Sequence, residues 1–151
     1  MELQGESRIA APREAVWIAL NDPEILRQCI PGCEAIEQVG ENQLAATVVS
    51  RIGPIKARFS GKVTLSDFDP PSAYTIAGEG NGGVAGVVQG RARVRLAEED
   101  GQTLLHYDTE AQINGKIAQI GARMIDLFVK KMAAEFFSRF GDIVAQRADA
   151  G

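Results

Sequence analysis

The sequence contains few of the residues that most often build metal sites and catalytic centres. Its 151 residues include one histidine, His106, and two cysteines, Cys29 and Cys33. A four-ligand zinc site cannot be assembled from that supply, so no metal site and no intrinsic cofactor are expected. The two cysteines are interpreted as reduced thiols, with a redox-sensitive pair or an adventitious bridge as the alternatives.

The chain also lacks an excess of positive charge, a long apolar run and a leader pattern. Its formal net charge is -4, which gives no general nucleic-acid-binding surface. No stretch of about 20 apolar residues could span a bilayer. Residues 1–7 do not show the basic and then apolar pattern of a secretory signal. We therefore expect a cytoplasmic protein, folded as one domain over residues 1–148 with a short disordered tail at 149–151.

The strongest periodic pattern lies in the last quarter of the chain, from Gly115 to about Arg147. Apolar residues recur there every three or four positions, at Ile117, Ile120, Met124, Phe128, Met132, Phe136, Phe140 and Val144. This spacing predicts one long helix with a wide apolar face. Such a helix is on the order of 45 to 50 Å long and needs a large apolar partner surface.

Most of the chain before this helix alternates between apolar and polar residues. The alternation and the turn residues predict strands at 2–10, 33–38, 43–52, 55–68, 73–80, 84–98 and 102–114. Pro12 and the pair Asp22 and Pro23 start two short helices after the first strand. The predicted fold class is α+β, with a curved antiparallel sheet of about six to seven strands wrapped around the long C-terminal helix.

The sheet face that turns toward the helix carries many small residues and no charged one. The small residues are Gly5, Ala46, Ser50, Gly61, Gly90, Ala92 and Ala111. Glycines can serve strand curvature, or the small residues can leave a hollow for a small molecule, and the alanines and serines favour the hollow. Because this face offers hydroxyls but no carboxylate, imidazole or amine, we predict a binding pocket and assign no catalytic residue.

Eight residues are predicted to line this pocket and to contact the ligand. They are Phe59, Tyr74, Val88, Tyr107, Thr109, Met124, Phe128 and Met132. Either Tyr74 or Tyr107 is expected to donate a hydrogen bond to a ligand carbonyl. The alternative for the helix methionines is ordinary core packing, since methionine serves both purposes.

Three other signals are weaker. Gly78, Gly80 and Gly83 match a dinucleotide-binding spacing, but a strand rather than a helix is predicted to follow them, so they are interpreted as a turn that forms a mouth of the pocket. His106 alternates with carboxylates on the outer face of its strand. Basic residues also point outward, at Arg51, Lys56, Arg58, Lys62, Arg91, Arg93 and Arg95. They form a solvated face or, if clustered, a contact for an acidic partner or anionic lipid headgroups.

Several stretches together resemble one family. They are Asp22-Pro23-Glu24; Ile30-Pro31-Gly32-Cys33-Glu34; Gly53-Pro54-Ile55-Lys56 with Phe59, Gly61 and Lys62; Asp67, Asp69-Pro70-Pro71 and Tyr74; Gly78 to Gly90; and Gly115 to Gly121. In this combination the chain resembles the G-subunit proteins of carbon monoxide dehydrogenase, which belong to the START-like (SRPBCC) superfamily with its helix-grip fold. The resemblance covers nearly the whole chain.

The resemblance implies a non-catalytic accessory protein of a molybdenum hydroxylase of the carbon monoxide dehydrogenase type. It implies that an apolar cavity holds a quinone or lipid-like molecule, and that the protein assists the enzyme at the inner face of the cytoplasmic membrane. The chain stops at Gly151, whereas some members continue into a hydrophobic anchor, so peripheral membrane contact is expected. The alternatives are a surface-acting assembly factor and a cyclase or hydrolase of the same fold.

Overall fold

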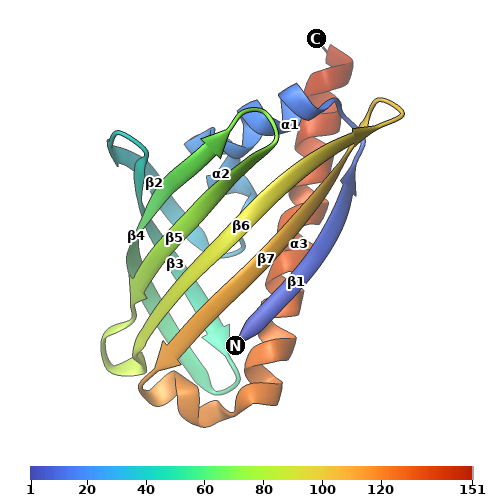
Figure 1. The fold of residues 1–151 in the computed structure, drawn as a ribbon. Helices are drawn as coiled ribbons and strands as arrows, with labels where there is room; N and C mark the ends of the chain where they lie inside the picture. The colour runs from blue at the N-terminus through green and yellow to red at the C-terminus, as the bar shows by residue number, and fades with distance from the viewer. Residues whose placement is uncertain (151) are drawn as a thin grey trace.

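The computed structural model describes residues 1–150, and its elements follow the order in Figure 1. They are β1 (Glu2–Ile9), α1 (Arg13–Leu20), α2 (Pro23–Cys29), β2 (Cys33–Gly40), β3 (Gln43–Ile52), β4 (Ile55–Asp69), β5 (Ala73–Asn81), the 3-10 turn η1 (Gly83–Ala85), β6 (Val87–Glu99), β7 (Gln102–Asn114), the 3-10 turn η2 (Lys116–Ile120) and α3 (Ala122–Ala150).

The strands form one antiparallel sheet in the order β1-β7-β6-β5-β4-β3-β2. Strands β2 to β7 are joined in sequence by hairpin connections, and β1 adds to the free edge of β7. The sheet curves around α3, with α1 and α2 at one end of the helix (Figure 1). The predicted fold class is therefore confirmed. The helix covers the sheet because the alternating strands bury their apolar face only against such a partner.

The prediction of one uninterrupted helix from Gly115 is wrong at its start. The chain leaves β7 at Gly115, passes through η2 and enters α3 only after Gly121. Both glycines have a positive φ, +96° and +103°, which an L residue in a helix does not adopt. The first part of the expected helix is therefore a separate connection at the end of the sheet.

Two other boundaries differ from those expected. Val84 lies in η1 and is 92% exposed, so β6 begins at Val87 rather than at Val84. The helix α3 includes residues 149 and 150, which were expected in a short tail, and Gly151 lies outside the described residues.

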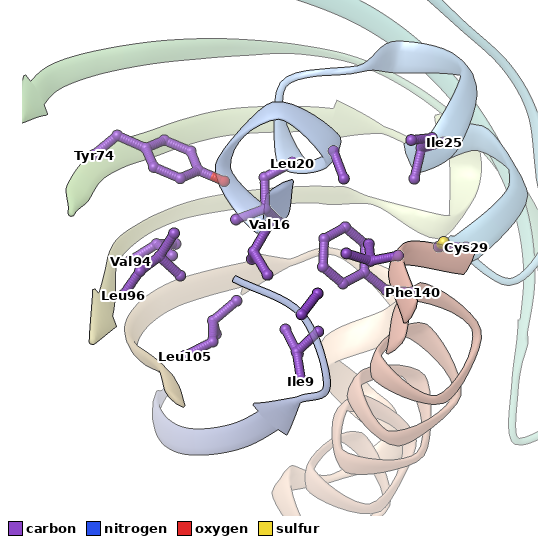
Figure 2. Packing of buried hydrophobic residues seen from close by; sticks show 13 residues of the cluster. Ile9, Val16, Leu20, Ile25, Cys29, Tyr74, Val94, Leu96, Leu105 and Phe140 are labelled. Atoms are coloured by element: carbon purple, nitrogen blue, oxygen red, sulfur yellow. The ribbon is translucent and has the colours of Figure 1, made fainter. Parts of the chain in front are cut away.

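Close packing is concentrated at the end of the molecule where α1 and α2 lie, here named the packed end. Val16, Leu20 and Ile25 from the short helices meet Leu105 from the sheet and Phe140 from α3, all 6% exposed or less. Figure 2 shows these side chains pointing toward one another from four elements. The aromatic ring of Phe140 is fully buried, so the packed end joins α3 firmly to the rest of the fold.

Truncation of Phe140 should be the most damaging single change to α3. Phe140→Ala removes a fully buried ring and is expected to lower the free energy of unfolding by about 3 to 5 kcal/mol. Leu127→Ala, on a residue of the same helix that is 61% exposed, should change it by less than about 0.5 kcal/mol. Urea unfolding of both variants measures the difference, and equal effects would contradict the placement of Phe140 in the core.

Candidate functional site

Between α3 and the middle of the sheet lies an apolar cavity of about 430 Å³. Its lining comes from every layer of the fold: Leu3, Leu20, Leu26, Ile30, Pro31, Ile36, Leu44, Ala46, Val63, Leu65, Tyr74, Ile76, Ala92, Val94, Leu105, Tyr107, Thr109, Val129, Met132, Ala133, Phe136 and Phe137. This volume falls in the range of sites that hold small organic molecules.

Small side chains of the sheet contribute to the cavity, since Ala46 and Ala92 belong to its lining. Ala92 pairs with Ile76 on one side and Thr109 on the other. The elements closest to α3 are α1, α2, β1, β3 and η2, and the central strands β5 and β6 are not among them. Since α3 faces this region partly with Ala133, neither layer fills the gap.

On α3, the lining residues are Val129, Met132, Ala133, Phe136 and Phe137. They are spaced i, i+3, i+4, i+7 and i+8, which is one face of a helix. On the opposite side, α2 contributes Leu26 and the residue that caps its C-terminus, Ile30. The start of α2 is fixed by Asp22, whose side chain accepts a hydrogen bond of 3.0 Å from the Glu24 backbone N–H.

Tyr74 is the most deeply buried polar residue of the lining. This residue is 2% exposed. The centroid of its ring lies 5.3 Å from that of Trp17, in an edge-on arrangement, and 6.3 Å from that of Phe68, in a stacked one. Burial raises the pKa of its hydroxyl well above the ordinary tyrosine value. The hydrogen bonds of the described residues do not include this hydroxyl. Because Tyr74 lines the cavity, its hydroxyl is a candidate donor to a ligand acceptor.

Tyr107 lies on the neighbouring part of the wall and explains a glycine in β1. Gly5 pairs with Tyr107 across the β1–β7 ladder, and a side chain on Gly5 would occupy the place of the Tyr107 ring. On its other side the Tyr107 ring stacks on Phe137 at 5.5 Å. Burial raises the pKa of Tyr107 as well, although this residue is less enclosed than Tyr74.

The structure brings four of the eight predicted ligand-binding residues to this cavity and places four elsewhere. Tyr74, Tyr107, Thr109 and Met132 line it, and their part in ligand binding stays a prediction. Phe59, Val88, Met124 and Phe128 do not line it.

The four displaced residues lie toward the other end of the sheet or off the lining face of α3. Phe59 covers Gly82, and Met124 is 47% exposed and packs against the turn at Gly53. Val88 pairs with Gly80 and Ile113, beyond the cavity. Phe128 is half-buried and lies one position before Val129, so it falls beside the face of α3 that lines the cavity.

Sequence reasoning missed the contributions of α2 and β2, which are Leu26, Ile30, Pro31 and Ile36. The apolar residues of α2 gave a signal for them, but only the sheet and the long helix were considered as walls.

Over the described residues, the lining contains no carboxylate, imidazole, amine or guanidinium group. His106 lies on the outer face, where its Nδ1 is 2.8 Å from Arg95 Nη2. Within residues 1–150, no group of three or more His, Cys, Asp or Glu side chains could hold a metal ion. Cys29 and Cys33 are free, and burial raises the pKa of both thiols, which makes them weak nucleophiles. The arrangement is built to enclose an uncharged molecule.

Comparison with known proteins identifies the family and the fold. A family model for CoxG, the G subunit of carbon monoxide dehydrogenase, matches residues 5–144. A conserved protein from Geobacillus kaustophilus has a similar structure, with a TM-score of 0.91 and 31% identity over 97% of this chain and 96% of that one. A search of curated protein sequences gives no match.

More distant structures share the fold alone. The ZhuI aromatase/cyclase from Streptomyces sp. R1128 has a TM-score of 0.68 and 16% identity, over 97% of this chain and 94% of that one. Ara h 8.0201 has a TM-score of 0.67 and 15% identity, over 97% of this chain and 98% of that one.

The burial of Tyr74 should appear in the pH dependence of stability. Below the ordinary tyrosine pKa of about 10, both the folded and the unfolded states hold the proton. Above it, the unfolded state loses the proton while Tyr74 in the folded state keeps it, so the free energy of unfolding falls by up to about 1.4 kcal/mol per pH unit. Tyr74→Phe should remove this part of the alkaline slope in urea titrations. An unchanged slope would show that the hydroxyl is not buried.

Proposed function

Because the chain belongs to the CoxG family of carbon monoxide dehydrogenase G subunits, we propose that it is a non-catalytic accessory protein that holds a hydrophobic small molecule in the cavity beneath α3. The observation that carries this proposal is the uncharged cavity, whose described lining includes the hydroxyl-bearing residues Tyr74, Tyr107 and Thr109. The enzyme served is a molybdenum hydroxylase of the carbon monoxide dehydrogenase type, which the family description supports.

The lining restricts the chemical class of the ligand to neutral molecules. A carboxylate or a phosphate enclosed there would have no cation among the described lining residues to compensate its charge, and an uncompensated buried charge is strongly unfavourable. Flat rings fit a wall on which the Tyr107 ring stacks on Phe137 and the Phe136 ring meets Phe137 edge-on. A carbonyl at the ring edge could accept the hydrogen bond that Tyr74 is free to donate.

A quinone combines these properties, since it is a neutral ring with two carbonyl oxygens. It can also accept electrons from a redox enzyme, which gives the accessory role a chemical purpose. Quinones with long apolar tails reside in membranes, so the protein would work peripherally at the inner face of the cytoplasmic membrane. Among the described helices, none has the length and hydropathy of a membrane-spanning segment.

The shared fold with an aromatase/cyclase leads to a second candidate, an enzyme of the cyclase kind that works in the same cavity. General acid or base catalysis in the same cavity would depend on the hydroxyls of Tyr74, Tyr107 and Thr109 alone among the described lining residues. Both tyrosine hydroxyls have raised pKa values, so neither is a ready base at neutral pH. The binding function is therefore favoured.

A matched pair of ligands tests the proposal. Dimethylnaphthoquinone and dimethylnaphthalene have nearly the same shape, but only the quinone has carbonyl oxygens, and its methyl groups block addition of the Cys33 thiol. The wild-type protein should bind the quinone about tenfold more tightly than the hydrocarbon, as expected for one buried hydrogen bond. Calorimetry and the fluorescence of Trp17, the neighbour of Tyr74, give the affinities.

Three variants locate the interaction. Tyr74→Phe should remove the preference for the quinone and leave the affinity for the hydrocarbon unchanged, whereas Tyr107→Phe should retain the preference. Ala92→Phe places a ring in the cavity and should abolish binding of both. If neither ligand binds the wild-type protein, the cavity proposal fails. Capture of a molybdenum hydroxylase by Ala92→Phe as efficiently as by the wild type would favour a surface-acting assembly factor.

A further inference from the structure

Three segments far apart in the sequence meet at the end of the molecule opposite α1, here named the loop end. They are residues 51–56 of the β3–β4 hairpin, residues 82–87 around η1 and residues 115–125, which include η2 and the start of α3. A Cβ on Gly53 would lie 3.1 Å from Met124 Sδ, and a Cβ on Gly115 would lie 2.6 Å from Gly86 Cα. The three segments are therefore in direct contact, and Figure 1 shows them below the sheet.

The loop end has the opposite charge to the rest of the protein. It contains Arg51, Lys56, Lys116 and Arg123 and no carboxylate. Since the whole chain has a formal charge of -4, the residues outside the loop end carry -8. All four cations are exposed, and the ion pairs of the described residues involve other side chains.

Three arginines on the outer face of the sheet have carboxylate neighbours, unlike the four cations of the loop end. Arg58, Arg91 and Arg95 each lie within 4 Å of a carboxylate, at Glu34, Asp67 and Asp108 respectively. These three arginines are therefore paired with carboxylates, whereas the four cations of the loop end lie close together without a carboxylate in the same segments.

Exposed apolar side chains lie at the same end and in the adjoining turn of α3. Val84, in η1, is 92% exposed, and Met124 and Leu127, one helical turn apart on α3, are 47% and 61% exposed. Asp126 beside Leu127 is paired with Lys130 at 2.9 Å. Exposed apolar side chains on η1 and the start of α3, beside exposed cations, match an interface that meets charged headgroups and places apolar groups just beneath them.

We propose that the loop end docks the protein on an anionic lipid surface, with its four cations against the headgroups and Val84, Met124 and Leu127 at the boundary of the acyl chains. The inference rests on the proposed function only for its purpose, because a carrier of an apolar ligand must reach the bilayer that contains the ligand. An acidic protein could also meet the cations. The exposed apolar side chains favour lipid, since Val84 in η1 and Met124 and Leu127 in the first turns of α3 lie beside the cations and are exposed to solvent.

Sedimentation with vesicles tests the inference with the whole chain. The wild-type protein should bind phosphatidylglycerol vesicles, should ignore phosphatidylcholine vesicles, and should be released by added salt. The double variant Lys116→Gln with Arg123→Gln should lower binding by about fivefold for each cation removed. Its control, Arg91→Gln with Arg95→Gln, makes the same change of charge on the outer face and should bind as the wild type does.

A second pair of variants tests the apolar contact. Val84→Ser should lower binding to phosphatidylglycerol by roughly tenfold. Ile18→Ser, which replaces an apolar residue of α1 that is 66% exposed at the opposite end, should have no effect. Neither change touches the core, so folding is retained, and circular dichroism verifies it.

Several results would overturn the inference. Wild-type protein that ignores phosphatidylglycerol, or a loss of binding that is equal in the two charge variants, excludes a specific lipid surface. Binding to polyglutamate that depends on Lys116 and Arg123, without binding to vesicles, would assign the loop end to an acidic protein instead. Titration of dimethylnaphthoquinone into the same samples keeps the two proposals separate, because loop-end variants should bind it normally.

Discussion

The structure depends on the distance that the small residues of the central strands leave between the sheet and α3. A helix and a sheet usually pack by interlocking large side chains, but here Ala46 and Ala92 of the sheet face a cavity that Ala133 lines from α3. The helix must then be held elsewhere. The packed end holds it with Phe140 and Val144, and at the other end Ile117 and Ile125 are buried. The cavity is thus a consequence of how the molecule distributes its close packing, with the middle left open between two sealed ends.

Sequence patterns predicted most of this architecture because strands and hairpins are local. The last strand, Gln102–Asn114, was predicted with the bounds that the structure shows, since Gly101 before it and Gly115 after it both need a positive φ. The start of the long helix was predicted too early, because Ile117 and Ile120 continue the helical spacing of the apolar residues that follow Gly121. A periodic pattern does not show on which side of a glycine the backbone stops being helical.

The cavity lining was harder to predict because it depends on register and on helix rotation. Tyr107 could be assigned to the inner face from alternation, but its position over Gly5 requires the pairing of β1 with β7. On α3, a rotation of one residue exchanges Phe128 for Val129 as a lining residue. Phe59 and Met124 have the correct chemical character for a pocket, and they were misplaced because alternation gives the face of a strand but not the position of the gap along it.

The uncharged cavity and the cationic loop end lie in different parts of the molecule, and together they link the proposed ligand to the proposed lipid surface. The cavity has no charged residue in its described lining, so the neutral apolar ligand proposed for it would partition from water into a bilayer. Most of the protein surface is acidic and is repelled by an anionic bilayer, while the loop end carries four cations outside the ion pairs of the described residues. Repulsion and attraction together leave one favourable approach, with the loop end first and the packed end facing away. An orientation fixed in this way would keep the outer face of the sheet and α1 accessible to a partner enzyme while the ligand is exchanged.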